Sequence, residues 1–290
     1  MKIFIITLLF ISSLLGFDFS ISNSITSNAR TVFIEFKQDK NINYEKIVAG
    51  KKEYAILKHP TDDSKLYALI PTSYYEKPSD KKLKILYHEN SNEKVKNIFL
   101  KVQDAQYEKE VLEVQKSKVN PTSKAVKQRT AKEYNEAMAI YNTITKESYI
   151  NSEFILPLSS KITSDFGKAR VYNGSLKGYH SGTDFRAKVG TAIVASNDGI
   201  VVLAKDRFYS GGSVIIDHGG GVYTCYYHMS KFDVQKGDKV KKSQLLGLSG
   251  DTGRVTGPHL HFSARVGGVQ VDPLQLITLL NQNLFKKNQN

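Results

Sequence analysis

Two histidines, His259 and His261, stand one residue apart in the stretch GPHLHF, in a chain that has seven histidines. Alternate residues of a β-strand face the same side, so both imidazoles would look into one space. Their Cα atoms would lie roughly 6.5–7 Å apart, which lets one ring bind a metal ion while the other reaches a water on that ion. The spacing alone does not say which ring takes which role.

A second pair of candidate ligands, His180 and Asp184, lies in the stretch YHSGTDF. Residues four apart on an extended strand are about 13 Å apart, too far to meet on one metal ion. We therefore expect the chain to bend between them, where Gly182 permits a turn or bulge. The motif YTCYYHMS places His228 at the end of a predicted strand, and IIDHGGG adds His218 as a further candidate.

The motifs GPHLHF, YHSGTDF and YTCYYHMS contain four of the seven histidines. Together with Asp184, these four form a set of nitrogen and carboxylate donors without a thiolate. Such a set favours zinc, and three protein ligands with one open position are typical of a catalytic zinc site. Copper or nickel would also bind this set in vitro. The alternative is a group of hydrogen-bonded sheet histidines with no metal.

The elements that must position these residues are mainly β. Residues 17–104 contain short alternating runs such as TVFIEFK and LYALIPT, separated by charged turns, which predict a small β-sandwich-like domain. His59 and His88 lie at the ends of such runs, and we expect both on the surface. Residues 151–276 are rich in glycine and strand signals and predict a compact antiparallel β domain.

Between these domains, residues 105–150 have helical spacing and predict a helical linker region. Asn120-Pro121-Thr122-Ser123 is the expected start signal of its helix. We expect the side that packs to carry Val126, Tyr134, Ala137, Met138, Tyr141 and Ile144. Residues 277–290 are expected to be a C-terminal tail.

The N-terminus and the overall charge bear on where the chain acts. Residues 1–16, with Lys2 before a short apolar run, have the layout of a secretory signal peptide. The net charge of +13 suits attraction to an extended polyanion. Export makes nucleic acid a poor partner, whereas an anionic envelope polymer fits better, and peripheral association with the envelope stays open. A single cysteine, Cys225, excludes an internal disulfide, and its aromatic surroundings predict a buried small side chain.

Taken in order, YHSGTDF, YTCYYHM and GPHLHF resemble the LytM/lysostaphin-type zinc peptidases, the M23 family of peptidoglycan endopeptidases. The resemblance covers about residues 154–276. The N-terminal part is similar, more weakly, to that of cell-shape peptidases from curved and helical Gram-negative bacteria. The resemblance implies a LytM-type antiparallel β catalytic domain with one Zn²⁺ per chain, held by His180, Asp184 and His261. It makes His228 and His259 the catalytic histidines and His218 a supporting residue.

The resemblance also implies an activity, a substrate and a compartment. We expect a periplasmic zinc metalloendopeptidase that acts on peptidoglycan stem peptides and muropeptides in cell-wall remodelling and cell shape. It would cut D-Ala–meso-diaminopimelate cross-links as a DD-endopeptidase and trim stems as a DD-carboxypeptidase. His259 would act as the base and His228 would stabilise the oxyanion, or the reverse. The alternatives are a glycyl-glycine endopeptidase and a non-catalytic LytM-type regulator of an amidase.

Overall fold

The computed structural model describes residues 9–10, 17–112, 123–172 and 174–286, which fall into two compact units. Unit 1 takes the chain up to Ala105 and again from Thr278, and unit 2 is Gln106–Ile277. The expected signal segment lies outside the described residues, apart from the two-residue strand β1 (Leu9–Phe10). Within the described ranges, no helix combines the length and the apolar character that crossing a membrane requires. The predicted domain limits differ from these units: the linker region falls within unit 2, and most of the tail within unit 1.

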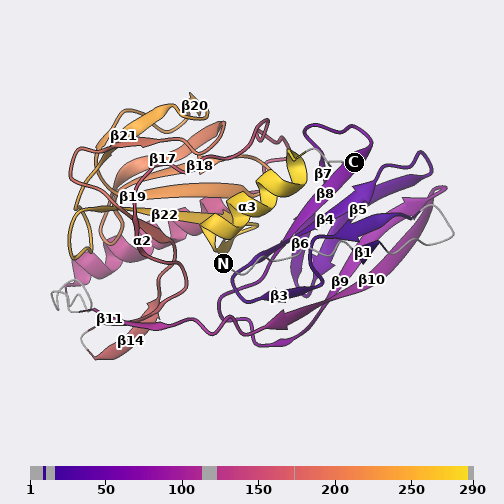
Figure 1. Ribbon diagram of the computed structural model, residues 1–290, viewed down its shortest axis with the longest axis horizontal. Coiled ribbons are helices and arrows are strands. Elements are labelled where there is room, and N and C mark those ends of the chain that lie inside the picture. Colours follow the sequence, from indigo (N-terminus) through magenta and orange to yellow (C-terminus); the bar gives the residue numbers. More distant parts are fainter. Residues whose placement is uncertain (1–8, 11–16, 113–122, 173, 287–290) are drawn as a thin grey trace. The chain divides into compact units, whose positions relative to one another are not determined.

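Unit 1 consists of two five-stranded sheets (Figure 1), and buried apolar side chains from both sheets form one core. Buried side chains such as Ile34 and Ile70 from one sheet and Ile47 and Leu83 from the other make up this core. The first sheet has the order β1, β2 (Phe19–Ile21), β4 (Thr31–Lys37), β8 (Lys65–Pro71), β7 (Leu57–Lys58). The second has the order β3 (Ile25–Ser27), β10 (Asn92–Gln103), β9 (Ser79–Glu89), β5 (Ile42–Ala49), β6 (Lys52–Ala55). The β architecture predicted for this part of the chain is therefore confirmed.

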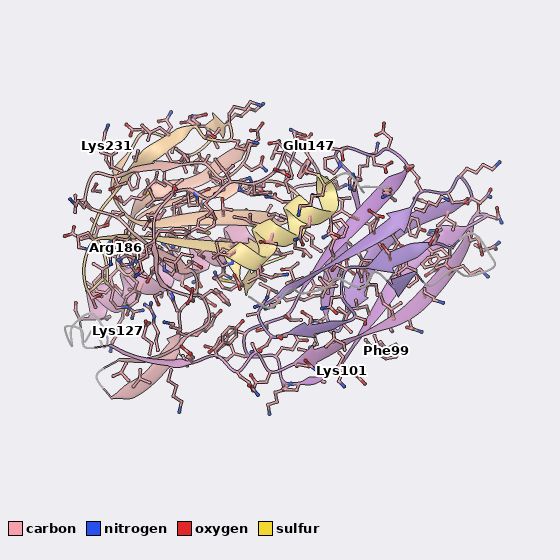
Figure 2. The ribbon with its side chains drawn as sticks, viewed as in Figure 1. Phe99, Lys101, Lys127, Glu147, Arg186 and Lys231 are labelled. Atoms are coloured by element: carbon pink, nitrogen blue, oxygen red, sulfur yellow. The ribbon has the colours of Figure 1, made fainter. Side chains whose placement is uncertain are left out.

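Strand β10 shows the two-residue period that defines the inner and outer faces of its sheet. Ile98, Leu100 and Val102 are buried, whereas the side chains of Phe99 and Lys101 project outward (Figure 2). This alternation is the same strand signal on which the β prediction for residues 17–104 rests.

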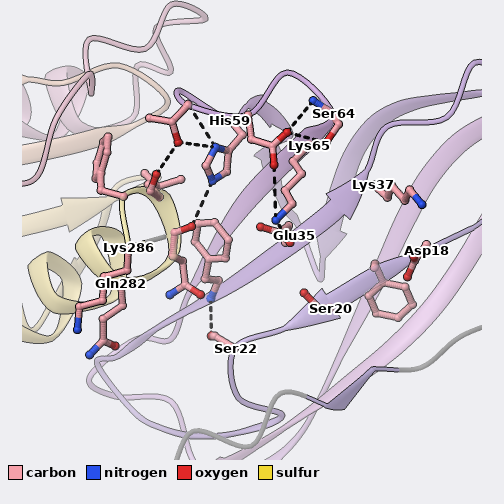
Figure 3. Close-up of a pocket in the computed structure, with 17 residues that line it drawn as sticks. Asp18, Ser20, Ser22, Glu35, Lys37, His59, Ser64, Lys65, Gln282 and Lys286 are labelled. Atoms are coloured by element: carbon pink, nitrogen blue, oxygen red, sulfur yellow. Dashed lines mark hydrogen bonds and ion pairs between the residues drawn. The ribbon is translucent and has the colours of Figure 1, made fainter. Parts of the chain in front are cut away.

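The last described residues of the chain close one side of unit 1, and they change the environment predicted for His59. The His59 side chain is buried, and its Nε2 lies 3.2 Å from the Asn283 carbonyl oxygen. Thr61 Oγ1 donates a 2.9 Å hydrogen bond to the Leu284 carbonyl (Figure 3). The surface position predicted for His59 is wrong, because its sequence neighbourhood carries no sign of a segment more than 220 residues later. The same residues line a shallow pocket with charged walls.

Unit 2 is built on a ten-stranded sheet. Its central strands run in the order β12 (Ile162–Ser164), β15 (Thr183–Arg186), β22 (His259–Val266), β19 (Val222–Phe232), β18 (Gly211–Asp217), β17 (Gly199–Arg207), β20 (Lys239–Val240). Strand β21 (Leu245–Ser249) pairs with β19 and with β16 (Ala192–Val194), and β23 (Val269–Val271) pairs with β22. Among the described residues, the strands of this sheet pair in antiparallel fashion, which confirms the predicted C-terminal fold class.

A small second sheet of unit 2 begins in the region predicted to be a helical linker. Strand β11 (Lys109–Leu112) pairs in parallel with β13 (Ala169–Tyr172), which pairs with β14 (Ser175–Tyr179). Residues 109–112, before the helix, thus form a strand of unit 2.

Helix α2 (Lys124–Tyr141) packs Ala137 and Tyr141 against the large sheet. Tyr134, predicted to face the core, is 63% exposed, and Glu133 is buried in its place. The Glu133 carboxylate accepts hydrogen bonds from the Phe208 backbone N–H and from Arg129 Nε, which offsets the cost of burying it. Of the expected start signal, only Ser123 lies within the described residues. Helix α3 (Pro273–Leu284) ends the described structure and passes from unit 2 into unit 1.

His218 is buried at the end of β18, where its ring links two parts of unit 2. Nδ1 lies 2.6 Å from the Asp198 carbonyl oxygen and Nε2 lies 2.7 Å from Thr224 Oγ1. Burial lowers its pKa to about 4, although the Asp198 contact works in the opposite direction. The ring is neutral at pH 7 and acts as a hydrogen-bonded structural element, as its predicted supporting role requires.

The pKa of His218 makes the stability of unit 2 dependent on pH. Between pH 6.5 and 4 the unfolded chain binds a proton on this ring that the folded chain rejects, so the free energy of unfolding falls as pH decreases. With about 1.4 kcal/mol per pKa unit, this residue accounts for a loss of about 3 kcal/mol. Denaturant unfolding of His218→Gln at several pH values should show a weaker pH dependence than the wild type. An unchanged dependence would contradict this assignment.

Candidate metal centre

Three neighbouring strands, β15, β22 and β19, bring the central residues of the site together. In the antiparallel registers, Asp184 pairs with His261, and His261 pairs with Tyr227. His259 and His261 lie on one strand, as the His-x-His spacing predicted. Paired residues of adjacent strands point to the same face, so the sheet itself fixes the carboxylate beside the imidazole.

His180 joins them because the chain bends at Gly182 before β15 begins. His180 Nε2 then lies 2.8 Å from Asp184 Oδ1 and 3.0 Å from His261 Nδ1, and His261 Nδ1 lies 2.8 Å from the same carboxylate oxygen. All three residues are buried, with at most 7% of their surface exposed. Among the described residues, they form the group of donor atoms that could hold a metal ion.

The donor atoms themselves indicate that a cation belongs between them. His180 Nδ1 lies 2.7 Å from the Asp165 carbonyl oxygen, which can only accept, so Nδ1 carries the proton and Nε2 of the neutral ring presents a lone pair. Two nitrogens and a carboxylate oxygen therefore face one another. Donors of a tetrahedral zinc ion with bonds of about 2.0–2.1 Å lie about 3.3 Å apart, so shifts of a few tenths of an ångström admit the ion.

The electrostatics of the site favour the protonation states that metal binding requires. Burial raises the pKa of Asp184, but the contacts of its carboxylate with His180 and His261 outweigh burial and hold that pKa well below its usual range. Burial lowers the pKa of His261 to about 4, although Asp184 works against this. At neutral pH, Asp184 is therefore an anion and the His261 ring is uncharged, which is the protonation that metal binding requires.

His228 and His259 lie next to this group, and each has its Nδ1 engaged by the backbone. His228 Nδ1 lies 2.8 Å from the Thr252 carbonyl oxygen, and His259 Nδ1 lies 2.8 Å from the Gly257 carbonyl oxygen. Their ring centroids are 4.8 Å apart, and His259 Nε2 lies 3.6 Å from Asp184 Oδ1. Nδ1 therefore donates in both rings and Nε2 is left as the acceptor, and in His259 this acceptor faces the site.

His228 lies inside β19 and not at a strand end as expected. The register of β19 shifts at this point, and His228 has a φ of 63°. A left-handed conformation is uncommon for a residue with a Cβ, and a bulge of this kind redirects a side chain out of the regular alternation. Burial, followed by the neighbouring His261 and His259, lowers the pKa of His228 well below its usual value.

Side chains that the motifs did not single out support the three donors. The Tyr227 ring stacks on His261 with centroids 5.6 Å apart, and its hydroxyl lies 2.8 Å from that of Tyr141 on α2. Arg170 Nη2 donates to Asp184 Oδ2 at 3.3 Å, which leaves Oδ1 for the centre of the site. The alternating aromatic run around Tyr227 is a sequence signal for such packing, whereas no short spacing links Arg170 to Asp184.

Comparisons with known proteins find that part of the chain, including this site, is similar to one peptidase family. Residues 178–273 match the model of Peptidase family M23. Over 134 residues the chain is 43% identical to a protein of Vibrio cholerae named peptidoglycan DD-endopeptidase ShyA, covering 45% of this chain and 31% of that protein. It is 40% identical over 97 residues to the DD-carboxypeptidase/endopeptidase Mpg of Neisseria meningitidis, covering 33% of this chain and 22% of that protein. The chain therefore spans less than a third of the length of either relative.

A solved structure extends the similarity of fold beyond the matched segment. The crystal structure of a putative peptidase M23 from Pseudomonas aeruginosa aligns with a TM-score of 0.66, over 85% of this chain and 93% of that one. At 23% sequence identity this likeness concerns the fold alone.

Gly182 is predicted to be required for the donor geometry. A Cβ at this position would lie 2.3 Å from the Phe262 carbonyl oxygen and 2.6 Å from His261 Nε2. Gly182→Ala should therefore displace His261 and weaken zinc binding by at least about tenfold, within the range seen when the support of a metal ligand is disturbed. Competition with a chromophoric chelator measures the affinity.

Gly257→Ala is the matched control, because a Cβ at Gly257 meets nothing within 4 Å. Equal affinities of the two variants would mean that the close approach of Gly182 to His261 has no part in shaping the site.

Proposed function

We propose that this chain, whose residues 178–273 are a metallopeptidase domain of family M23, is a zinc-dependent peptidoglycan hydrolase. The observation that carries the proposal is the convergence of His180 Nε2, Asp184 Oδ1 and His261 Nδ1 within 3.0 Å of one another in a buried space. These three atoms would hold one zinc ion. A bound zinc would supply a Lewis acid for the peptide carbonyl and lower the pKa of a water from about 15.7 to about 7.

His259 and His228 would move the protons of the reaction. The chain from Asn151 onward has a single glutamate, Glu153, which lies in none of the three motifs, so the histidines are the candidates for the base. We assign the first transfer to His259, because its Nε2 lies within 3.6 Å of a ligand oxygen and can accept the proton of the attacking water. His228 would accept or donate a proton at the other side of the scissile amide. Its ring, when protonated, would stabilise the oxyanion.

The two relatives support the choice of substrate, since both are named for DD-peptidase activity and ShyA also for peptidoglycan. We propose cleavage of D-Ala–meso-diaminopimelate cross-links, together with DD-carboxypeptidase trimming of stem peptides. Peptidoglycan lies outside the cytoplasmic membrane, so this role goes with export by residues 1–16 to the periplasm and with a part in cell-wall remodelling and cell shape.

Digestion of purified peptidoglycan tests this function directly. The full-length protein with zinc should convert cross-linked dimers to monomers, and a chelator should abolish the reaction until zinc is restored. Mass analysis of the muropeptides identifies the bond. Cleavage of glycine bridges alone would replace the proposed specificity by a glycyl-glycine endopeptidase, and no cleavage of any muropeptide would leave the amidase-regulator alternative.

Replacing the two flanking histidines separates zinc binding from proton transfer. His259→Ala and His228→Ala should each keep one zinc ion per chain but lose activity by at least about 10²-fold, the lower end of general acid–base catalysis. Zinc content and initial rates on the same samples provide the check. Loss of zinc in His259→Ala would show that the roles of His259 and His261 are exchanged.

A further inference from the structure

Strand β11 brings a carboxylate to the metal centre from outside the matched family segment. Its parallel pairing with β13 places Glu110 opposite Arg170. Glu110 Oε2 lies 3.0 Å from Arg170 Nε, and both atoms are buried. The two groups form an ion pair rather than a linear hydrogen bond. A carboxylate held in this way is costly to bury unless a cation neutralises it.

The same carboxylate is connected to two of the three donor residues. On one side, Arg170 Nη2 lies 3.3 Å from Asp184 Oδ2, so the guanidinium bridges Glu110 and a metal-ligand candidate. On the other side, Ser164 Oγ donates a 3.0 Å hydrogen bond to Glu110 Oε1. Ser164 Oγ also lies 3.2 Å from His180 Nδ1. Because the Ser164 proton is used by Glu110, the Ser164 oxygen accepts from His180 Nδ1–H, which also faces the Asp165 carbonyl oxygen, and this second contact helps to fix the orientation of the His180 ring.

The charges explain why the connection through Arg170 matters. The Arg170 guanidinium holds Asp184 Oδ2 and leaves Oδ1 for the centre of the site, but its positive charge repels a metal ion bound at Oδ1. Glu110 binds the Nε side of the guanidinium, away from Asp184, and its negative charge offsets the positive charge of Arg170. The Lys168 ammonium, 4.0 Å from Glu110 Oε1, adds a further positive charge on this side, which increases the need for Glu110.

We propose that Glu110 is a positioning residue of the metal centre, which acts on Asp184 through Arg170 and on His180 through Ser164. The inference rests on the proposed zinc site. It adds to that site a residue that the family segment, residues 178–273, does not contain. Strand β11 would then belong to the working site, and the catalytic segment alone would bind zinc more weakly than the chain that includes residues 106–112.

Zinc affinity of the full-length chain tests the role of Glu110 independently of activity. Glu110→Gln keeps the size of the side chain but removes its charge, and it should weaken zinc binding about 10- to 100-fold in chelator competition, as loss of an outer partner typically does. The exposed Glu108 provides the control, since Glu108→Gln makes the same charge change two residues earlier in the chain, just before β11 begins. Its affinity should equal that of the wild type.

A double variant separates charge compensation from simple damage to the fold. If Glu110 offsets Arg170, Glu110→Gln/Arg170→Gln should bind zinc more tightly than Glu110→Gln alone, because the unopposed guanidinium is gone. The visible spectrum of the cobalt-substituted proteins should be altered in Glu110→Gln and closer to wild type in the double variant. Wild-type affinity in Glu110→Gln, or a double variant that binds no better than the single one, would overturn the inference. A wild-type protein without bound zinc would instead refute the proposed function.

Discussion

The structure of unit 2 around the site holds three donor atoms within 3.0 Å of one another: two imidazole nitrogens and one carboxylate oxygen. The His180 Nε2 lone pair and the Asp184 carboxylate face each other with little water to screen them, and a cation between them would stabilise this arrangement. The backbone maintains the arrangement: the β15–β22 register fixes Asp184 beside His261, and the bend at Gly182 returns His180 to the same place. The strand pairing and the bend therefore hold the donors together before a cation binds, and a bound cation would stabilise the arrangement further.

Much of the support for this centre comes from the segment before the matched family domain. Helix α2 contributes Tyr141, whose hydroxyl meets that of Tyr227 behind His261, and β11 contributes Glu110, which meets Arg170 behind Asp184. Residues 106–150 thus form part of the C-terminal unit, with contacts that reach the donor residues through a single intermediate side chain. A metal site with such outer contacts can have its affinity tuned without any change in its ligands.

The parts of the site that sequence could predict are those governed by local geometry. A two-residue period places His259 and His261 on one face, and a four-residue spacing with a glycine requires a bend. The bulge at His228 was not predictable from the motif, because the register shift depends on pairing with a strand about fifteen residues earlier. The burial of Glu133 in place of Tyr134, and the role of Glu110, depend on partners more than fifty residues away, which periodicity does not report.

The central claim is that the three donors hold one divalent ion. The most direct measurement is elemental analysis of the folded, full-length protein after reconstitution with zinc at neutral pH and removal of excess metal. The account predicts one zinc ion per chain in the wild type and none retained by His180→Ala or Asp184→Ala. A wild-type protein that retains no stoichiometric metal, or variants that retain as much as the wild type, would contradict it.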